Sequence, residues 1–417
     1  MEADERDKRA RVVTALERSA TALGQGASKL ANGLEAGDFY AQAGELVRGV
    51  TEGARNAGLG ERGGAARPKR LGELLGPALE RFKARVRGDE KPVPLPWPSL
   101  AERLGGGLWP GAHVLVGSTG TGKTQLQLQL ALHAARAGVP VLYIGLELGE
   151  LDTMARLIAL LDEAKGAGVR FSDLMRGAVP EERFDALAEA AVLHLAELGF
   201  ELETGDAHGW DYTKLGPAVR ALRERYGLDS KAPVLVVLDY LQLVDSPEGK
   251  REELRERIGR AAYQAREAAR NAGAAVLVTS SLARTSDKLL TEWGRAWPEE
   301  KTADGTGLLD LVGLGKEAGE VEFSADTVIV MARTLKAEGE AETRVRLGVP
   351  KQRNGGPGEL TLCFNGSRWV EDTARETARE AARKALAATQ GPSGGRPRAR
   401  GNAAADLRAG AEVDVGD

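Results

Sequence analysis

Residues 117–124 read GSTGTGKT, and this stretch decides the fold. It satisfies the pattern G-x-x-x-x-G-K-[ST], whose glycines let backbone N–H groups close around phosphates because they carry no Cβ. A short apolar run at 113–116 precedes it. The stretch that follows, QLQLQLAL, alternates with the period of a strand, but a phosphate loop must lead into the N-terminus of a helix. The sequence therefore predicts a strand, a phosphate-binding loop and a helix.

The residues of this loop have predicted roles in holding a nucleotide and its metal. Lys123 is expected to reach the β- and γ-phosphates, and the hydroxyl of Thr124 is expected to bind Mg²⁺. The other loop residues expected to contact the nucleotide are Gly117, Ser118, Thr119, Gly120, Thr121, Gly122 and Gln125. A chance glycine-rich turn is the alternative, and the two fitting flanks argue against it.

Apolar runs alternate with amphipathic stretches over much of the chain. The runs lie at 113–116, 139–146, 233–238, 274–279, 326–331 and 343–350. The clearest amphipathic stretch, 252–272, places Leu254, Ile258 and a row of alanines on one helical face. This alternation is typical of βαβ units. It predicts an α/β fold with a mainly parallel sheet and helices on both faces.

Three further strand ends carry polar side chains. Glu147 follows the second apolar run, Asp239 follows the third, and Ser280 and Ser281 follow the fourth. Since ligands of open α/β sheets bind at the carboxyl ends of the strands, these residues are expected to gather beside the phosphate loop. Asp239 would then complete the Mg²⁺ site, and Glu147 would orient or deprotonate the attacking water. For Glu147 the alternative is an ordinary surface carboxylate.

Composition limits the class of protein. The 417 residues carry 57 Lys+Arg and 61 Asp+Glu, a net charge of −4, which argues against a uniformly basic DNA-binding protein. The single cysteine excludes a disulfide framework, and the four scattered histidines have no zinc-ligand spacing. The charged N-terminus and the lack of an 18-residue apolar run predict neither secretion nor a membrane span, and so a cytoplasmic location.

Changes in composition divide the chain into four segments. Residues 1–69 are rich in Ala and Gly and predict marginal helices or disorder. Residues 70–98 predict a helix with one apolar face, which Pro77 is expected to break or kink, and then a Pro-rich extended linker. This helix either packs on its own domain or docks on a neighbouring subunit. Residues 99–372 are expected to form the nucleotide-binding domain, and residues 373–417 a low-complexity, disordered tail, whose first part (373–389) could extend a helix.

Five stretches in one order resemble motifs of the hexameric replicative helicases of the DnaB type, a branch of the RecA-like ATPases. They are LELGELDTMARL at 146–157, MRGAVPEERFDAL at 175–187, LDYLQLV at 238–244, KEAGEVEFSADTVIVMAR at 316–333 and KQRNGGPGEL at 351–360. The resemblance covers about 90–372, roughly two thirds of the chain. It implies a RecA-like P-loop NTPase fold, ATP and Mg²⁺ as cofactors, and a homo-oligomeric ring, expected to be a hexamer, that translocates on single-stranded DNA.

The resemblance also implies roles for residues outside the phosphate loop. Lys351 and Arg353 would reach into the nucleotide site of the adjacent subunit and contact the γ-phosphate, where cations stabilise phosphoryl transfer. The alternative is two solvated charges on a strand edge. Residues 70–87 fall where the family has a linker helix that packs on the adjacent subunit. Ser281, expected to contact the nucleotide, stands where the family has Gln, and its shorter hydroxyl would weaken coupling to the DNA loop.

Single-stranded DNA would pass through the ring beside the loop at about 284–325. The candidate phosphate contacts in this loop are Arg284, Lys288, Arg295, Lys301 and Lys316. Trp293 and Trp297 either stack on bases or pack the loop against its domain, and packing is favoured. Residues 1–69 do not resemble the family's primase-contacting domain, so primase is not an expected partner. A helicase loader is a further candidate partner.

Two other functions stay open at this point. RecA-like proteins also act as recombination mediators or as switches of the KaiC type, which hydrolyse ATP without unwinding DNA. In the third alternative, ATP only drives the assembly of a non-motor interaction protein, which Glu147 argues against. Duplex unwinding separates the first function from the second, and ATP turnover separates both from the third.

Overall fold

The computed structural model describes residues 70–162, 168–204, 210–247, 252–280, 284–295, 307–311, 325–334, 343–374 and 377. The chain divides into two compact units, which are Met1–Lys83 and Ala84–Asp417. The marginal helices or disorder predicted for 1–69, and most of the predicted tail, lie outside the described residues.

Helix α3 (Leu71–Arg87) corresponds to the helix predicted within 70–98 and continues through Pro77, which therefore does not break it. Ala84 is its buried residue. The large apolar side chains of α3 are instead exposed: Leu71, Leu74, Leu75, Leu79, Phe82 and Val86. An amphipathic helix is stabilised mainly by burial of its apolar face. The exposed face of α3 is thus available for a contact beyond the described residues.

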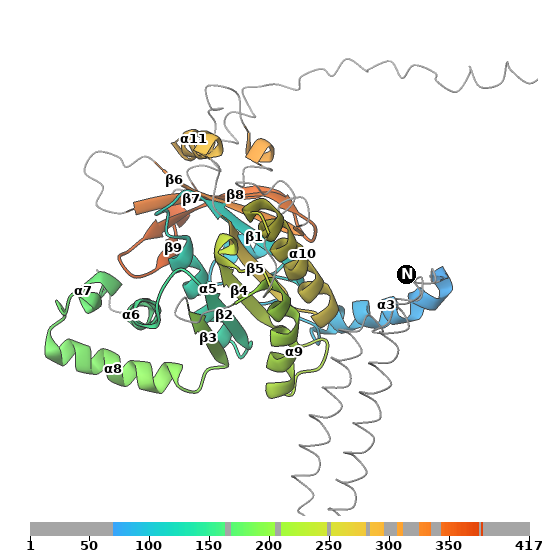
Figure 1. Cartoon of the computed structure of the whole chain (residues 1–417), viewed down its shortest axis with the longest axis horizontal. Helices are drawn as coiled ribbons and strands as arrows, with labels where there is room; N and C mark the ends of the chain where they lie inside the picture. Colours follow the sequence, from blue (N-terminus) through green and yellow to red (C-terminus); the bar gives the residue numbers. More distant parts are fainter. Residues whose placement is uncertain are drawn as a thin grey trace, which may run out of the picture. The chain divides into compact units, whose positions relative to one another are not determined.

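The described residues of the second unit are built on a sheet of nine strands in the order β3-β2-β4-β5-β1-β6-β7-β8-β9 (Figure 1). The strands are β1 (Gly111–Gly117), β2 (Val141–Gly145), β3 (Phe200–Thr204), β4 (Leu235–Asp239), β5 (Ala275–Ser280), β6 (Thr327–Arg333), β7 (Thr343–Gln352), β8 (Gly358–Phe364) and β9 (Trp369–Glu371). The first six strands of this order run parallel, and β7, β8 and β9 extend the sheet in antiparallel fashion. The predicted mainly parallel sheet is confirmed.

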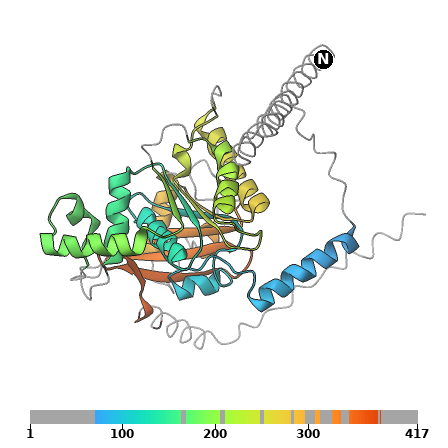
Figure 2. The ribbon, with the colours of Figure 1, turned by 90° about the horizontal axis from the view of Figure 1, so that it is seen from below.

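Helices cover both faces of this sheet, as predicted (Figure 2). The helices described in this unit are α4 (Pro98–Arg103), α5 (Lys123–Arg136), α6 (Glu150–Leu161), α7 (Phe171–Met175), α8 (Glu181–Leu195), α9 (Leu215–Arg225), α10 (Leu254–Ala272) and α11 (Arg284–Arg295). The described residues also form three short 3₁₀ helices, η1 (Tyr212–Lys214), η2 (Leu241–Leu243) and η3 (Leu308–Leu311). One apolar cluster joins the sheet to α5 and α6, and a second joins it to α9, α10 and α11. Among the described residues, no helix is long and apolar enough to cross a membrane.

The strand that precedes the phosphate loop shows how the two clusters arise. All seven residues of β1 are buried. Leu115 belongs to the cluster on the α5 face, whereas Val114 and Val116 belong to the cluster on the α10 face. Successive side chains of a strand point to opposite faces, so a strand covered on both sides is apolar throughout rather than alternating.

The Pro-rich stretch predicted as a linker is extended, but it packs into the core. Val93, Leu95 and Trp97 are buried in the α5-face cluster. Val93 forms an antiparallel bridge with Leu108, and Trp97 Nε1 donates a hydrogen bond to the backbone oxygen of Trp369 at 3.0 Å. Prolines cannot donate backbone hydrogen bonds, so the side chains between them fix this stretch by packing.

His113 on β1 makes the stability of the fold depend on pH. Burial lowers the pKa of its imidazole. The hydrogen bond with Trp109 and the charge of Asp326 raise this pKa, but burial has the larger effect. The unfolded chain therefore binds a proton more readily than the folded one, and the free energy of unfolding falls as the pH drops below the ordinary value of 6.5. We expect the melting temperature to fall between about pH 7.5 and about pH 5.5, and to fall less in His113→Gln. Equal falls in both proteins would contradict this role.

Candidate active site

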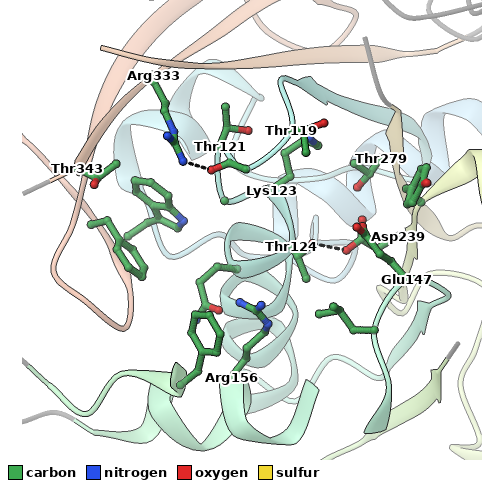
Figure 3. A pocket seen from close by; sticks show the side chains of 18 residues that line it. Thr119, Thr121, Lys123, Thr124, Glu147, Arg156, Asp239, Thr279, Arg333 and Thr343 are labelled. Carbon is green, nitrogen blue, oxygen red and sulfur yellow. Dashed lines mark hydrogen bonds between the residues drawn. The ribbon is translucent and has the colours of Figure 1, made fainter. Parts of the chain in front are cut away.

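A cavity of about 700 Å³ lies at the carboxyl ends of β1, β2, β4 and β5 (Figure 3). Its lining is formed by Thr119, Gly120, Thr121, Gly122, Lys123, Thr124, Gln125, Glu147, Leu148, Arg156, Phe171, Asp239, Tyr240, Thr279, Arg333, Thr343, Phe364 and Trp369. This volume is in the range of small-molecule sites. The structure thus brings together the phosphate loop and the two carboxylates that the sequence places at separate strand ends.

The phosphate loop joins the end of β1 to the first turn of α5. Gly120 and Gly122 have positive φ angles of 74° and 95°, which other residues adopt at a cost in energy. Lys123 Nζ donates to the backbone oxygens of Gly117 and Ser118 at 2.7 and 2.9 Å. Burial lowers the pKa of Lys123, while the charges of Asp239, Glu147 and Asp287 raise it. The ammonium group therefore lies inside the loop, where the phosphates of a nucleotide would bind.

Thr124 and Asp239 form the pair expected at a Mg²⁺ site. Thr124 Oγ1 donates to Asp239 Oδ2 at 2.7 Å, and the hydroxyl of Tyr143 donates to the same oxygen at 3.3 Å. Burial raises the pKa of Asp239, and the hydrogen bonds from Thr124, Thr279 and Tyr143 together with the charge of Lys123 lower it. Mg²⁺ is usually bound by one or two carboxylates plus substrate phosphates. This donor set therefore fits the metal.

Glu147 is exposed on the rim of the cavity, two residues beyond the end of β2. Figure 3 shows its side chain beside Asp239, on the side of the cavity away from Thr343. A carboxylate at this place can accept a proton from a water molecule that approaches the terminal phosphate. The cavity therefore combines a phosphate loop with a carboxylate that could act as a general base in the hydrolysis of a bound nucleotide.

Two arginines in the cavity were not identified from the sequence. Arg156 projects from α6, and its guanidinium lies 3.8 Å from the centre of the Phe171 ring, a cation–π contact. Arg333, the last residue of β6, donates a hydrogen bond to the backbone oxygen of Gly120. Arg156 lies within 146–157 and Arg333 within 316–333, two of the stretches that resemble the helicase motifs. Nothing in the spacing of these arginines indicates a role.

An aromatic wall closes the cavity on the side of β8 and β9. The rings of Phe364 and Trp369 lie 4.9 Å apart at 48°. Trp369 is 3% exposed, so it packs in the core as well as lining the site. Backbone groups of Trp369 bind the amide of Gln129 through two hydrogen bonds, at 2.8 and 2.7 Å. A rigid apolar surface of this kind suits the flat ring of a nucleobase.

Gly122 lies against this wall, and we expect Gly122→Ala to weaken ATP binding by roughly tenfold or more. A Cβ at Gly122 would lie 2.6 Å from Cζ2 of Trp369. The alanine would also have to adopt the left-handed backbone conformation that Gly122 has. Titration with a fluorescent ATP analogue measures the loss. Gly138→Ala is the matched control, because Gly138 has a φ of 80° but no atom within 4 Å of an added Cβ. Equal affinities in the two variants would rule out the contact with Trp369.

Lys351 and Arg353 do not line the cavity of their own chain. Because β7 is antiparallel to β6, Lys351 pairs with Val328 near the start of β6, whereas the phosphate loop begins at Gly117, level with Met331. Three residues of strand separate these levels, about 10 Å. Lys351 and Arg353 therefore lie toward the amino ends of the parallel strands, whereas the cavity lies at their carboxyl ends. Arg353 is 47% exposed there.

The other predicted nucleotide contacts divide between described and undescribed parts of the chain. Gln125 is buried, lines the cavity and donates from Nε2 to the backbone oxygen of Ser367 at 2.8 Å. Ser281 lies outside the described residues. Its neighbour Ser280 is buried at the end of β5 and accepts a hydrogen bond from Gln242 Nε2 at 3.2 Å.

Among the predicted DNA contacts, Lys288 and Arg295 are exposed on α11. Trp293 is buried, and the guanidinium of Arg346 lies 4.1 Å from the centre of its ring. Packing, the favoured interpretation of Trp293, is confirmed. The remaining predicted contacts lie outside the described residues or have side chains that do: Arg284, Trp297, Lys301 and Lys316.

A parallel sheet whose β1 leads into a phosphate loop, with Asp239 at the end of β4, defines a RecA-like P-loop NTPase. Within this class, the family model of the DnaB-like helicase C terminal domain matches residues 99–369. The chain belongs to that family.

Two solved structures have a similar fold. One, described as an ATPase domain, has 19% identity and a TM-score of 0.56, with 73% of this chain and 99% of that one covered. A DnaB-like replicative helicase, solved with a view to its interactions with primase, has 17% identity and a TM-score of 0.59, covering 87% of this chain and 76% of that one. At these identities the likeness concerns the fold. No curated protein matches the sequence.

Proposed function

We propose that the protein is an ATP-dependent DNA helicase, a ring-forming motor that translocates on single-stranded DNA and separates the duplex in replication. The observation that carries the proposal is one cavity that combines Lys123, the Thr124–Asp239 pair and Glu147 in a domain of the DnaB-like family. A binding protein without turnover would need the phosphate loop but not a carboxylate in the position of Glu147.

ATP hydrolysis would begin with an exchange of hydrogen bonds at Lys123. Its ammonium group leaves the oxygens of Gly117 and Ser118 for the β- and γ-phosphates, whose charge it neutralises. Thr124 and Asp239 would hold Mg²⁺, which would neutralise charge on the same phosphates. Glu147 accepts a proton from the attacking water as its oxygen bonds to the γ-phosphorus and the bond to ADP breaks.

The site is completed by a second copy of the chain. Lys351 and Arg353 lie too far along the sheet to serve their own cavity, so their charges serve that of a neighbour in a homo-oligomer, a hexamer by family resemblance. The exposed apolar face of α3 docks on an adjacent subunit and supports the ring. Hydrolysis would then depend on assembly.

DNA and a loader are the partners of this ring, in the cytoplasm. The exposed cations Lys288 and Arg295 on α11 supply phosphate contacts for single-stranded DNA. A helicase loader would place the ring on DNA. Primase is not among the proposed partners.

The test is ATP hydrolysis by the purified protein with and without single-stranded DNA, with Lys123→Ala as the blank. Stimulation by DNA followed by unwinding of a forked duplex supports the motor. Hydrolysis that is indifferent to DNA favours the second candidate, a RecA- or KaiC-like ATPase that acts as a mediator or switch. Ser281 at the family's Gln position is the observation that favours this second candidate. Absence of hydrolysis by an assembled ring would contradict both.

A further inference from the structure

Arg353, the candidate trans-acting arginine, is held by a carboxylate of its own chain. Its Nη1 lies 2.8 Å from Oδ1 of Asp326, the residue before β6. The Arg353 side chain is 47% exposed, whereas the Asp326 side chain is 14% exposed. The ion pair therefore joins the mostly buried carboxylate of Asp326, at the start of β6, to a guanidinium on the surface.

Asp326 is fixed in place by hydrogen bonds to the first residues of β1. Its Oδ2 accepts from the backbone N–H of Ala112 at 2.9 Å, and its own N–H donates to the backbone oxygen of Ala112 at 2.7 Å. Oδ2 of Asp326 also lies 2.8 Å from the position that a Cβ on Gly111 would take, so the carboxylate fills the space beside that glycine. The carboxylate cannot move far without breaking these bonds.

The backbone of Arg353 is fixed as well. Its N–H donates to Oε1 of Gln352 at 2.7 Å, and the same oxygen accepts from the hydroxyl of Thr327 at 2.8 Å. The segment after β7 is thus tied to the start of β6 at two points, one through Gln352 and one through Asp326. The backbone of Arg353 is thus held at one end of the side chain, and Asp326 holds the guanidinium at the other end.

We propose that Asp326 is the positioning residue for Arg353: it orients the guanidinium toward the γ-phosphate bound by the neighbouring subunit. The inference rests on the trans-acting role of Arg353 in the proposed function. A guanidinium has five N–H donors in a rigid fork, so a contact with Asp326 leaves others for phosphate. Orienting this long side chain before the phosphate arrives removes an entropic cost from the chemical step. An ordinary surface ion pair would have no such effect on turnover.

Asp326→Asn tests this role with little change in shape. The amide oxygen of the new side chain can still accept from Ala112, but the charge that holds Arg353 is lost. We expect kcat for ATP hydrolysis by the assembled ring to fall roughly tenfold, with KM unchanged. An unchanged or raised kcat would overturn the proposal. If Asp326→Asn does not assemble in a sizing run, Asp326→Glu replaces it, because its longer side chain displaces the guanidinium while keeping the charge.

Asp372→Asn is the matched control. Asp372 pairs with Arg344 at the same distance of 2.8 Å, and its side chain is also 14% exposed. Arg344 is the neighbour of Thr343, which lines the cavity, and alternation along β7 directs the two side chains to opposite faces. Asp372→Asn should therefore lose a similar ion pair and keep its kcat. An equal loss of kcat in both variants would mean a general effect of lost ion pairs and would overturn the inference.

A second background separates positioning from structural support. In Arg353→Lys the charge remains but the fork is absent, so Asp326→Asn should lower kcat less than about twofold there. The same tenfold loss in both backgrounds would contradict positioning. Normal hydrolysis by Arg353→Ala would instead remove the trans-acting role itself, and the Asp326 inference with it. Loss of hydrolysis in Arg353→Ala with full activity in Asp326→Asn would overturn the inference alone.

Discussion

Replacement of Lys123 by alanine should lower ATP hydrolysis by roughly 10³-fold or more, which leaves no turnover in a standard assay. In the structure the ammonium group lies 2.7 and 2.9 Å from the backbone oxygens of Gly117 and Ser118. Without it, these two oxygens would face the phosphates with no cation between them. The variant thus loses an attraction and gains a repulsion at the same place. Phosphate release measured with and without single-stranded DNA records the loss.

Lys231→Ala is the control for this variant. Lys231 is exposed on a turn before β4 and takes no part in the cavity. It removes the same charge from the chain, so its rate of hydrolysis should equal that of the unchanged protein. Full hydrolysis by Lys123→Ala would mean that nucleotide turnover occurs elsewhere in the chain, and the proposed site would have to be abandoned.

The parallel part of the sheet could be predicted because its strands are buried on both faces. The apolar runs in β1, β2, β4 and β5 stand out for that reason, and each of these strands is buried throughout. β3 was missed, since four of its five residues are partly exposed at the edge of the sheet, and two of these four are glutamates. β9, at the other edge, has three residues, too few for a pattern. Edge strands depend on tertiary pairing more than on their own sequence.

The side of the cavity that carries the phosphate loop and the two carboxylates could be predicted as well. Lys123, Thr124, Glu147 and Asp239 follow strands of one parallel sheet, so topology alone brings them to one edge. The opposite wall could not be predicted. Arg333 contacts a residue 213 positions away, and it reaches the loop because β6 pairs with β1 in one particular register.

The aromatic wall was missed for a related reason. Trp369 is buried in the core, and the antiparallel pairing of β8 with β9 also places it against the phosphate loop. Such a register is decided by contacts between distant parts of the chain rather than by the local pattern. The trans-acting role proposed for Lys351 and Arg353 comes from the family resemblance, and the strand register shows that the two residues lie away from the cavity of their own chain.

Replacement of Arg353 by alanine should also stop hydrolysis, by roughly 10³-fold or more, while ATP affinity stays within about threefold. The reason is that Arg353 is remote from the cavity of its own chain, where the proposed function places ATP, and would act on the charge of the transition state in the neighbour's cavity. Phosphate release and titration of a fluorescent ATP analogue give the two quantities. Arg225→Ala, which removes an exposed arginine paired with Glu201, should change neither.

Mixed rings decide whether Arg353 acts between subunits. Arg353→Ala and Lys123→Ala subunits are each expected to be inactive alone. When both are present in one ring, some interfaces combine the intact Lys123 of one subunit with the intact Arg353 of the next. Hydrolysis should therefore reappear on mixing, at a level set by the proportion of such interfaces. If the two residues served the same cavity of one chain, every site in a mixed ring would lack one of them, and mixing would restore nothing.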